Sequence, residues 1–309
     1  GGRPVVRSFN RLPGDIGHAL RVANGAVLVL DATKGVEVGA EKMWMEIRKH
    51  NLPAIIYVNK MDKENVKFDE VLNLIKTRLG KQAVPFCLPI GKQNDFNGFA
   101  DIVELKARIY DGIACVDGDI YPDKLAKVQA LRQELVENVA GADEALLEKY
   151  FGGEELTIDE IKHGLRLSVS SGEAVPVMVG SATKNIGPLT LLHMIREYFP
   201  SASESAPSEG VKPGTEEAAT RKCADDEPFS AYVFKTLVDP FVGIINLIQV
   251  KSGTIKKDQE VFVSHSNDVE KTGPLFTVVG KSRIPLELCH AGDICAVTRM
   301  AKVTTDTTI

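Results

Sequence analysis

The chain has 309 residues, of which 44% are hydrophobic and 26% are charged, and its formal net charge is −5. This length allows two or three domains with separate cores, and the composition excludes a wholly disordered chain. No apolar run reaches the roughly 18 residues of a membrane span, and no signal peptide is recognisable, so we expect a cytoplasmic protein.

The first part of the chain alternates strand and helix patterns. A buried strand is predicted from residue 25 to Asp31, then an amphipathic helix, then a second strand over 54–58. A further helix is expected to end at Gly80, because glycine readily takes the left-handed conformation that closes many helices. This alternation indicates parallel strands covered by helices, which is an α/β fold. The predicted core-facing residues of the two helices are Ala40, Met43, Trp44, Ile47, Phe68, Val71, Leu72, Ile75 and Leu79.

Residues 86–175 break this rhythm and read as an inserted α+β subdomain. Short strands are expected within 98–111 and helices over 122–141 and 143–151. The predicted helix over 122–141 carries an apolar stripe that should face the core, formed by Leu125, Val128, Leu131, Leu135 and Val139. The section has 9 basic and 17 acidic residues, a net charge of −8, and so offers a surface for a basic partner; a merely solvated surface is the alternative.

After the insertion the α/β pattern resumes and then gives way to short β-rich runs. A strand beginning at residue 175 and a following helix complete the first domain, predicted over 1–200. Residues 201–226 are rich in Ser, Pro, Glu and Gly and read as a linker. The short β runs over 227–309, separated by Gly, Asp and Asn, predict a small β-barrel.

The stretch "VNKMDK", residues 58–63, ends the second predicted strand and has the chemistry of a guanine-reading loop. Strand ends in parallel sheets face ligand crevices. The Asp62 carboxylate can accept two hydrogen bonds from guanine's ring N–H and amino group, the Asn59 amide suits the imidazole nitrogen, and the Lys60 stem can lie along the ring. The alternative is an ordinary turn with Asp62 as a helix cap.

A second loop makes the guanine site the stronger interpretation. The sequence "GSATKNIG", residues 180–187, follows another predicted strand. Its small residues Ser181 and Ala182, with Thr183 beside them, can bring backbone N–H groups to the guanine carbonyl oxygen. The five cysteines are scattered without a CxxC pair, and we expect neither a metal ligand nor a catalytic residue among the side chains of this chain.

The chain resembles the elongation factor G-like translational GTPases over roughly residues 16–309. The resemblance is carried by the two loops and by the segments "GAVLVLDATKGVEVGAEKMW", "LPIGKQNDFNGFADIVELKARIY" and "GSATKNIGPLTLLHMIREYFPS". The resemblance implies a P-loop GTPase-type parallel sheet, N-terminally truncated, followed by a translation-factor β-barrel. It makes Asn59, Lys60, Asp62, Ser181, Ala182 and Thr183 the residues that hold GTP or GDP. It also implies the ribosome as partner, with the stalk protein at 86–175 and small-subunit RNA at the barrel around Lys256, Lys257, Lys281 and Arg283.

The family's phosphate-binding half is not found in these 309 residues. GTP hydrolysis with Mg²⁺ needs a GxxxxGK[ST] loop, and none occurs. The nearest string to the family's second switch is "RLPGD", with Arg11 and Asp15 in place of its Asp and His; the resemblance gives His18 no catalytic role. We therefore expect a fragment of a full factor, inactive alone. A non-hydrolysing ribosome-binding paralogue, or a ribosomal protection or peptide-release GTPase, remains the alternative.

Overall fold

The computed structural model describes residues 13–240, 243–280 and 282–309. They form two compact units, each described here by itself: one is Gly25–Phe199, and the other combines residues 13–24 with Pro200–Ile309. The sequence assigned 1–200 to one domain, whereas helix α1 (Pro13–Leu20) groups with the second unit. One reason is that the Arg21 guanidinium just after α1 pairs with Asp306 of that unit. Arg11 of "RLPGD" lies outside the described residues.

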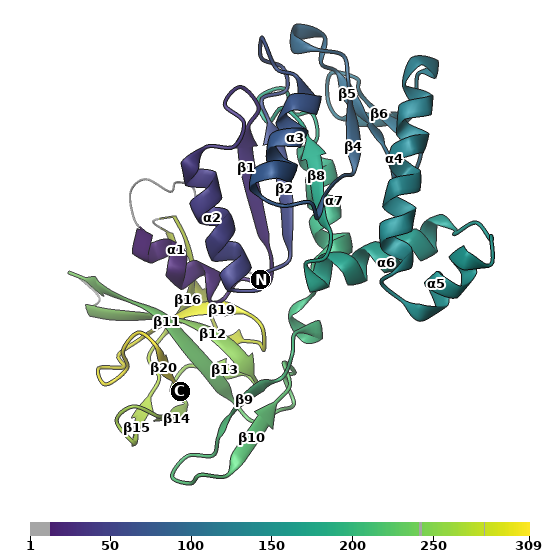
Figure 1. The fold of residues 1–309 in the computed structure, drawn as a ribbon. Helices are drawn as coiled ribbons and strands as arrows, with labels where there is room; N and C mark the ends of the chain where they lie inside the picture. Colours follow the sequence, from purple (N-terminus) through teal and green to yellow (C-terminus); the bar gives the residue numbers. More distant parts are fainter. Residues whose placement is uncertain (1–12, 241–242, 281) are drawn as a thin grey trace. The chain divides into compact units, whose positions relative to one another are not determined.

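A parallel four-stranded sheet forms the centre of the first unit (Figure 1). Its strands are β1 (Ala26–Asp31), β2 (Ala54–Asn59), β8 (Val175–Val179) and β3 (Ala83–Pro85), in the order β1-β2-β8-β3. Helices α2 (Val38–Lys49), α3 (Phe68–Arg78) and α7 (Pro188–Tyr198) connect or follow these strands. The α/β fold with parallel strands is thereby confirmed.

The helices of this sheet bury most of the residues that their spacing predicts, while Ala40 and Met43 of α2 are half-buried. Trp44 and Ile47 are the buried side chains of α2, and Phe68, Val71, Leu72 and Ile75 are those of α3. Gly80 follows α3 with a φ of 125°, a value that strains any residue with a Cβ atom. The apolar stripes and the glycine therefore explain where these helices pack and where α3 stops.

The inserted section contains a four-stranded antiparallel meander and three helices. The strands are β4 (Cys87–Ile90), β5 (Gly98–Asp101), β6 (Lys106–Tyr110) and β7 (Cys115–Gly118), with a short 3₁₀ turn at Gln93–Asp95. The helices are α4 (Pro122–Ala140), α5 (Glu144–Phe151) and α6 (Ile158–Ser171). The expected strands within 98–111 and the two expected helices are present.

Two features of this section differ from the sequence prediction. Leu125 is 41% exposed rather than core-facing, because the first turn of α4 extends beyond the part that packs near α6 (Figure 1). Helix α6 was not predicted, although Thr157 and Glu160 form a reciprocal capping box at its start. A Thr-x-x-Glu pattern ahead of apolar residues is a helix-start signal, so α6 was recognisable in principle.

The second unit is an antiparallel β domain, which confirms the predicted change of fold class after the first unit. Its largest sheet has the order β17-β16-β19-β12-β11-β20, and its core includes Val233, Ile248, Val263 and Val297. The strands are β11 (Ser230–Asp239), β12 (Gly243–Ser252), β13 (Ile255–Lys256), β14 (Glu260–Val263), β15 (Asp268–Lys271), β16 (Leu275–Val279), β17 (Ser282–Leu286), β18 (Leu288–Cys289), β19 (Ile294–Thr298) and β20 (Thr307–Thr308).

The segment predicted as a linker, 201–226, contains regular structure. A 3₁₀ turn at Ala202–Glu204 precedes an antiparallel hairpin of β9 (Ser208–Val211) and β10 (Ala218–Arg221). Composition missed this hairpin because backbone pairing between two strands needs no large apolar side chain. No helix in the described part of the chain is both long enough and apolar enough to cross a membrane.

Candidate functional site: two loops at one sheet edge

The carboxyl ends of three strands meet at one edge of the parallel sheet. Register places Asp31 at the end of β1 opposite Asn59 at the end of β2, and Val58 of β2 opposite Val179 of β8. Beyond the last pair the backbone continues to connect the two loops, since the Met61 N–H donates to the Gly180 carbonyl at 3.1 Å. The stretches 58–63 and 180–187, distant in sequence, therefore form one structural unit.

The second loop is a closed turn that is hydrogen-bonded to a buried tyrosine of β2. The backbones of Ser181 and Ile186 exchange two hydrogen bonds of 2.9 and 3.0 Å. The Tyr57 hydroxyl of β2 donates to the Ile186 carbonyl at 3.2 Å. A Cβ atom on Gly180 would lie 2.5 Å from that same carbonyl oxygen, so the tyrosine can pack here only because residue 180 is glycine.

Asn59 connects the two loops through its side chain. Its Oδ1 accepts a hydrogen bond of 2.9 Å from the backbone N–H of Ala182. The amide oxygen is thus engaged with the loop, while the Nδ2 group remains a donor that suits the imidazole nitrogen of a purine. Because the Ala182 N–H already has this partner, its contact with a guanine carbonyl stays a prediction.

Lys60 is fixed by a residue that the sequence reading did not include in the site. It has a φ of 65°, and its Nζ lies 2.5 Å from Oδ2 of Asp31. Asp31 also accepts hydrogen bonds from the backbone and hydroxyl of Thr33. Burial alone would raise the pKa of Asp31, but the hydrogen bonds from Lys60 and Thr33 outweigh burial, and the pKa is lowered. The contact with Asp31 in turn raises the pKa of Lys60. The parallel register, rather than any local motif, brings Asp31 to Lys60.

Asp62 offers a buried carboxylate whose Oδ1 atom has no hydrogen bond of normal geometry among the described residues. Its side chain is 6% exposed, Oδ2 lies 3.4 Å from Nζ of Lys63, and Oδ1 accepts no hydrogen bond in the described structure. Burial raises the pKa of Asp62, yet the Ser181 hydroxyl, the local backbone and Lys63 together lower it below its usual value. The carboxylate is therefore ionised at neutral pH, and an unpaired buried acceptor of this kind is costly unless a donor fills it.

Ser181 and Thr183 complete the predicted set. Ser181 is fully buried, its hydroxyl lies 3.2 Å from that of Thr183, and it accepts the N–H of Lys184 at 3.3 Å. Ala182 and Thr183 are exposed at the loop surface. The structure thus brings all six predicted residues to one edge of the sheet. Within the described residues, no group of three His, Cys, Asp or Glu side chains gathers as a metal site.

The hydrogen-bonding groups at this edge fit a guanine base better than an adenine. An ionised carboxylate without a donor matches the two N–H groups on one edge of guanine, whereas adenine presents an acceptor and a carbon there. Ala182 and Thr183 are exposed, so this turn is open to solvent. The phosphate-binding part of a nucleotide site is not formed by these two loops.

Comparison with known proteins gives three findings. The family described as Elongation factor Tu GTP binding domain matches residues 14–201, and the family described as Elongation factor G domain 2 matches residues 228–308. A crystal structure of a protein from Thermus thermophilus resembles this chain with a TM-score of 0.81 at 26% sequence identity. The match covers 98% of this chain and 43% of that one, so this chain spans less than half of that protein's length.

Proposed function

We propose a function from the premise that this chain belongs to the translational GTPases, with an elongation factor Tu-type GTP-binding domain and an elongation factor G domain 2. On this premise the chain is the guanine-reading and ribosome-binding part of a cytoplasmic elongation factor G-like GTPase. The complete factor would use Mg²⁺-dependent GTP hydrolysis to drive translocation. For this chain alone we propose binding without hydrolysis, because its sequence has no GxxxxGK[ST] loop.

One observation carries the guanine-binding part of the proposal. The unpartnered Oδ1 atom of Asp62 lies beside a loop that Asn59 and Gly180 tie to the same sheet edge. A site built around an unpaired acceptor discriminates strongly, since a base without the matching donors leaves the carboxylate buried and unpaired. Thus the loops support selection of the base independently of the phosphates.

Nucleosides test base reading without the phosphate contribution. We expect guanosine to bind the full chain at least tenfold more tightly than adenosine, because each charge-assisted hydrogen bond contributes about 1.5–3 kcal/mol. Titrations followed by amide chemical shifts would measure both affinities and locate the perturbed residues. Equal affinity for the two nucleosides, or shifts that avoid residues 59–63 and 180–187, would rule out the guanine site.

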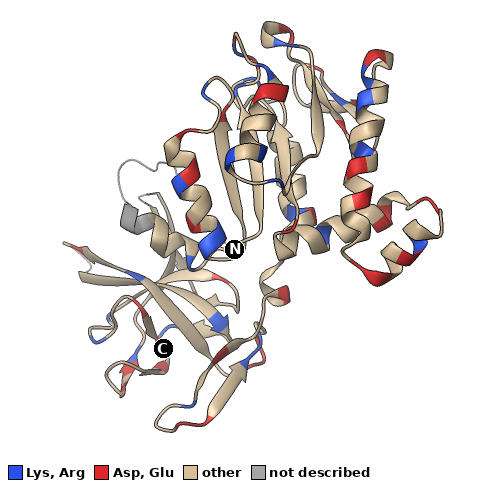
Figure 2. Cartoon of the chain, viewed as in Figure 1, with Lys and Arg blue, Asp and Glu red and all other residues tan. Residues whose placement is uncertain are grey.

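The ribosome-binding part rests on the charge of the inserted section and on the family. Figure 2 shows acidic and basic residues alternating along α4 and mainly acidic residues at α5 and the loop after it, in the section whose net charge is −8. In the predicted basic patch of the β domain, Arg283 pairs with Asp239, which offsets its charge. Lys281 of that patch lies outside the described residues. The acidic section is therefore the better supported docking surface.

Charge neutralisation on the inserted section tests this docking surface. Glu154 and Glu155 are exposed just after α5, and replacing both with glutamine should weaken co-sedimentation with purified ribosomes about two- to fivefold at low salt, since peripheral charges mainly steer association. A matched control replaces the exposed Glu209 and Glu216 around the β9 hairpin, which should leave sedimentation unchanged. Identical behaviour of the two variants would remove the acidic section from the interface.

A further inference from the structure

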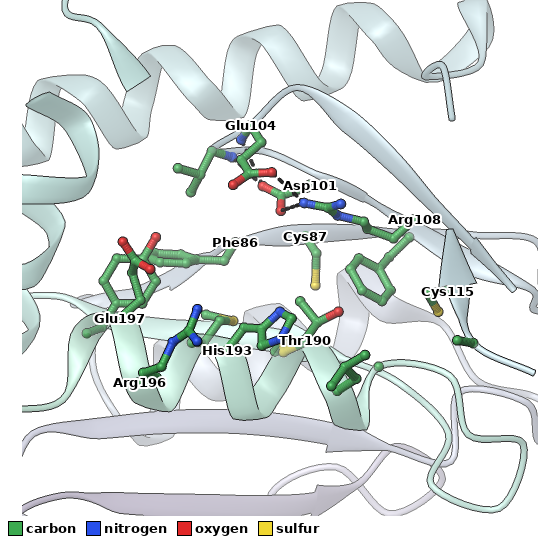
Figure 3. A pocket seen from close by; sticks show the side chains of 18 of the residues that line it. Phe86, Cys87, Asp101, Glu104, Arg108, Cys115, Thr190, His193, Arg196 and Glu197 are labelled. Carbon is green, nitrogen blue, oxygen red and sulfur yellow. Dashed lines mark hydrogen bonds and ion pairs between the residues drawn. The ribbon is translucent and has the colours of Figure 1, made fainter. Parts of the chain in front are cut away.

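A cavity of about 310 Å³ lies inside the first unit, between helix α7 and the inserted sheet (Figure 3). This volume is at the lower end of the range for small-molecule pockets, which runs from about 300 to 1,000 Å³. Its apolar lining includes three aromatic rings together with aliphatic and sulfur-containing side chains such as Met178. The rings of Phe86 and Tyr198 meet edge to face with centroids 5.5 Å apart, and Phe99 is the third. The cavity can therefore accept a small body with an aromatic ring.

The wall formed by the inserted sheet has its charges paired. Glu104 accepts a hydrogen bond of 2.7 Å from Nζ of Lys162 and a second from the guanidinium of Arg108. Asp101 accepts two backbone N–H groups, each at 2.9 Å. Burial raises the pKa of Asp101, and the guanidinium of Arg108 lies 3.9 Å from its Oδ2 atom. This wall therefore leaves little unbalanced charge for a ligand.

The opposite wall, formed by α7, carries cationic and polar side chains without such partners. Thr190, His193 and Arg196 follow one another along α7 and line the cavity; His193 and Thr190 lie across from Asp101 and Arg108, whereas Arg196 lies toward the end near Phe86 (Figure 3). Among the described residues no ion pair of His193 or Arg196 is found, and Glu197 lies beside Arg196 at the end of the cavity near Phe86 (Figure 3). The α7 wall therefore presents hydrogen-bond donors and the positive charge of Arg196 next to aromatic surface, with the acidic Glu197 at the same end.

We propose that this cavity binds a small amphipathic carboxylate, with its acid group at Arg196 and His193 and its apolar body against Phe86, Phe99 and Tyr198. A guanidinium holds a carboxylate through two parallel N–H donors, and the Thr190 hydroxyl adds a third donor on the same face of α7. The aromatic lining supplies the apolar contact that a free carboxylate ion lacks. This assignment is independent of the nucleotide.

The cavity borders the loop 180–187. A ligand bound in the cavity should therefore change the amide signals of this loop. Asn185 and Gly187 line the cavity, and the Asn185 Nδ2 group donates to the Ile113 carbonyl of the inserted section at 3.1 Å. The Lys184 Nζ donates to the Asn94 carbonyl at 2.9 Å. Because these contacts join the loop to the inserted section, a ligand between them should shift the amide signals of both.

A set of three ligands with one shared body tests the proposal. The full chain is titrated with 4-phenylbutyrate, 4-phenylbutyramide and 4-phenylbutylamine while amide chemical shifts are followed. We expect saturable binding of the carboxylate at least about tenfold tighter than of the amide or the amine, with shifts at Asn185, Gly187 and Thr190. Equal affinities, tighter binding of the amine, no saturation by the carboxylate, or shifts confined to other sites would overturn the proposal.

Variants of α7 separate the charged contact from a general apolar pocket. Arg196 is exposed at the rim, so its replacement leaves the core intact, and Arg196→Gln should lower carboxylate affinity about tenfold without changing affinity for the amide. Arg196→Lys should retain part of the preference. The control Lys42→Gln removes an equal charge from the exposed face of α2 and should change nothing. Unchanged carboxylate affinity in Arg196→Gln would also refute the assignment.

Discussion

Replacing Asp62 with asparagine should reverse the base preference of the chain from guanine toward xanthine. The carboxylate of Asp62 presents two acceptors, which match the ring N–H and amino group of guanine. An asparagine presents one acceptor and one donor, and xanthine carries a carbonyl oxygen where guanine carries the amino group. The ratio of guanosine to xanthosine affinity should therefore fall by at least about a hundredfold, because one good contact is lost and one is gained.

The measurement compares guanosine and xanthosine titrations of the two proteins under one set of conditions. Wild-type binding of guanosine should be constant from about pH 8 to about pH 5, since the pKa of Asp62 lies below its usual range and the carboxylate stays ionised there. As control, Asp119→Asn changes an exposed aspartate of the same unit and should preserve guanosine preference. An unchanged ratio in Asp62→Asn would show that this side chain does not read the base.

The parts of the site that local sequence signals encode were predictable. The strand ends at Asp31, Asn59 and Val179 follow from continuous apolar runs that stop at polar or glycine residues. Because the carboxyl ends of parallel strands share an edge, a prediction of parallel strands is enough to bring stretches 58–63 and 180–187 together. Their common location did not require any knowledge of side-chain packing.

The contacts that depend on register and packing were not predictable in the same way. The ion pair of Lys60 with Asp31 exists because Asp31 lies opposite Asn59, and a shift of one residue would separate them. The hydrogen bond from Tyr57 to Ile186 requires a glycine at residue 180, which only a three-dimensional contact reveals. Tertiary partners, rather than propensity, decide these details.

The hairpin β9–β10 and helix α6 illustrate two different failures of sequence reading. A signal for α6 existed in the Thr157 and Glu160 capping box, so this helix was missed rather than hidden. Residues Ser208–Val211 and Ala218–Arg221 have a composition typical of linkers, and their pairing depends on backbone hydrogen bonds that composition does not record. Composition thus indicates how little apolar surface such a segment can bury. It does not indicate whether the backbone forms paired strands.

Gly180→Ala should destabilise the first unit and distort the guanine-reading loop together. The added methyl group would lie 2.5 Å from the Ile186 carbonyl oxygen and even closer to the Tyr57 hydroxyl, which is buried and hydrogen-bonded to that oxygen. Overpacking of a rigid contact and loss of one buried hydrogen bond should together cost about 2–4 kcal/mol of unfolding free energy. Guanosine binding should also weaken, because the Gly180 carbonyl accepts the Met61 N–H that joins the two loops.

The single tryptophan allows the unfolding of the first unit to be measured separately from that of the second. Trp44 is buried in α2, so its fluorescence during urea unfolding reports on the unit Gly25–Phe199. The matched control Gly210→Ala adds the same methyl group where nothing lies within 4 Å, and should leave the Trp44 transition in place. Asp62→Asn should impair base selection with a smaller stability change, whereas Gly180→Ala should impair both. A Gly180→Ala protein with wild-type stability and guanosine affinity would mean that the close packing of Tyr57, Gly180 and Ile186 does not support the site.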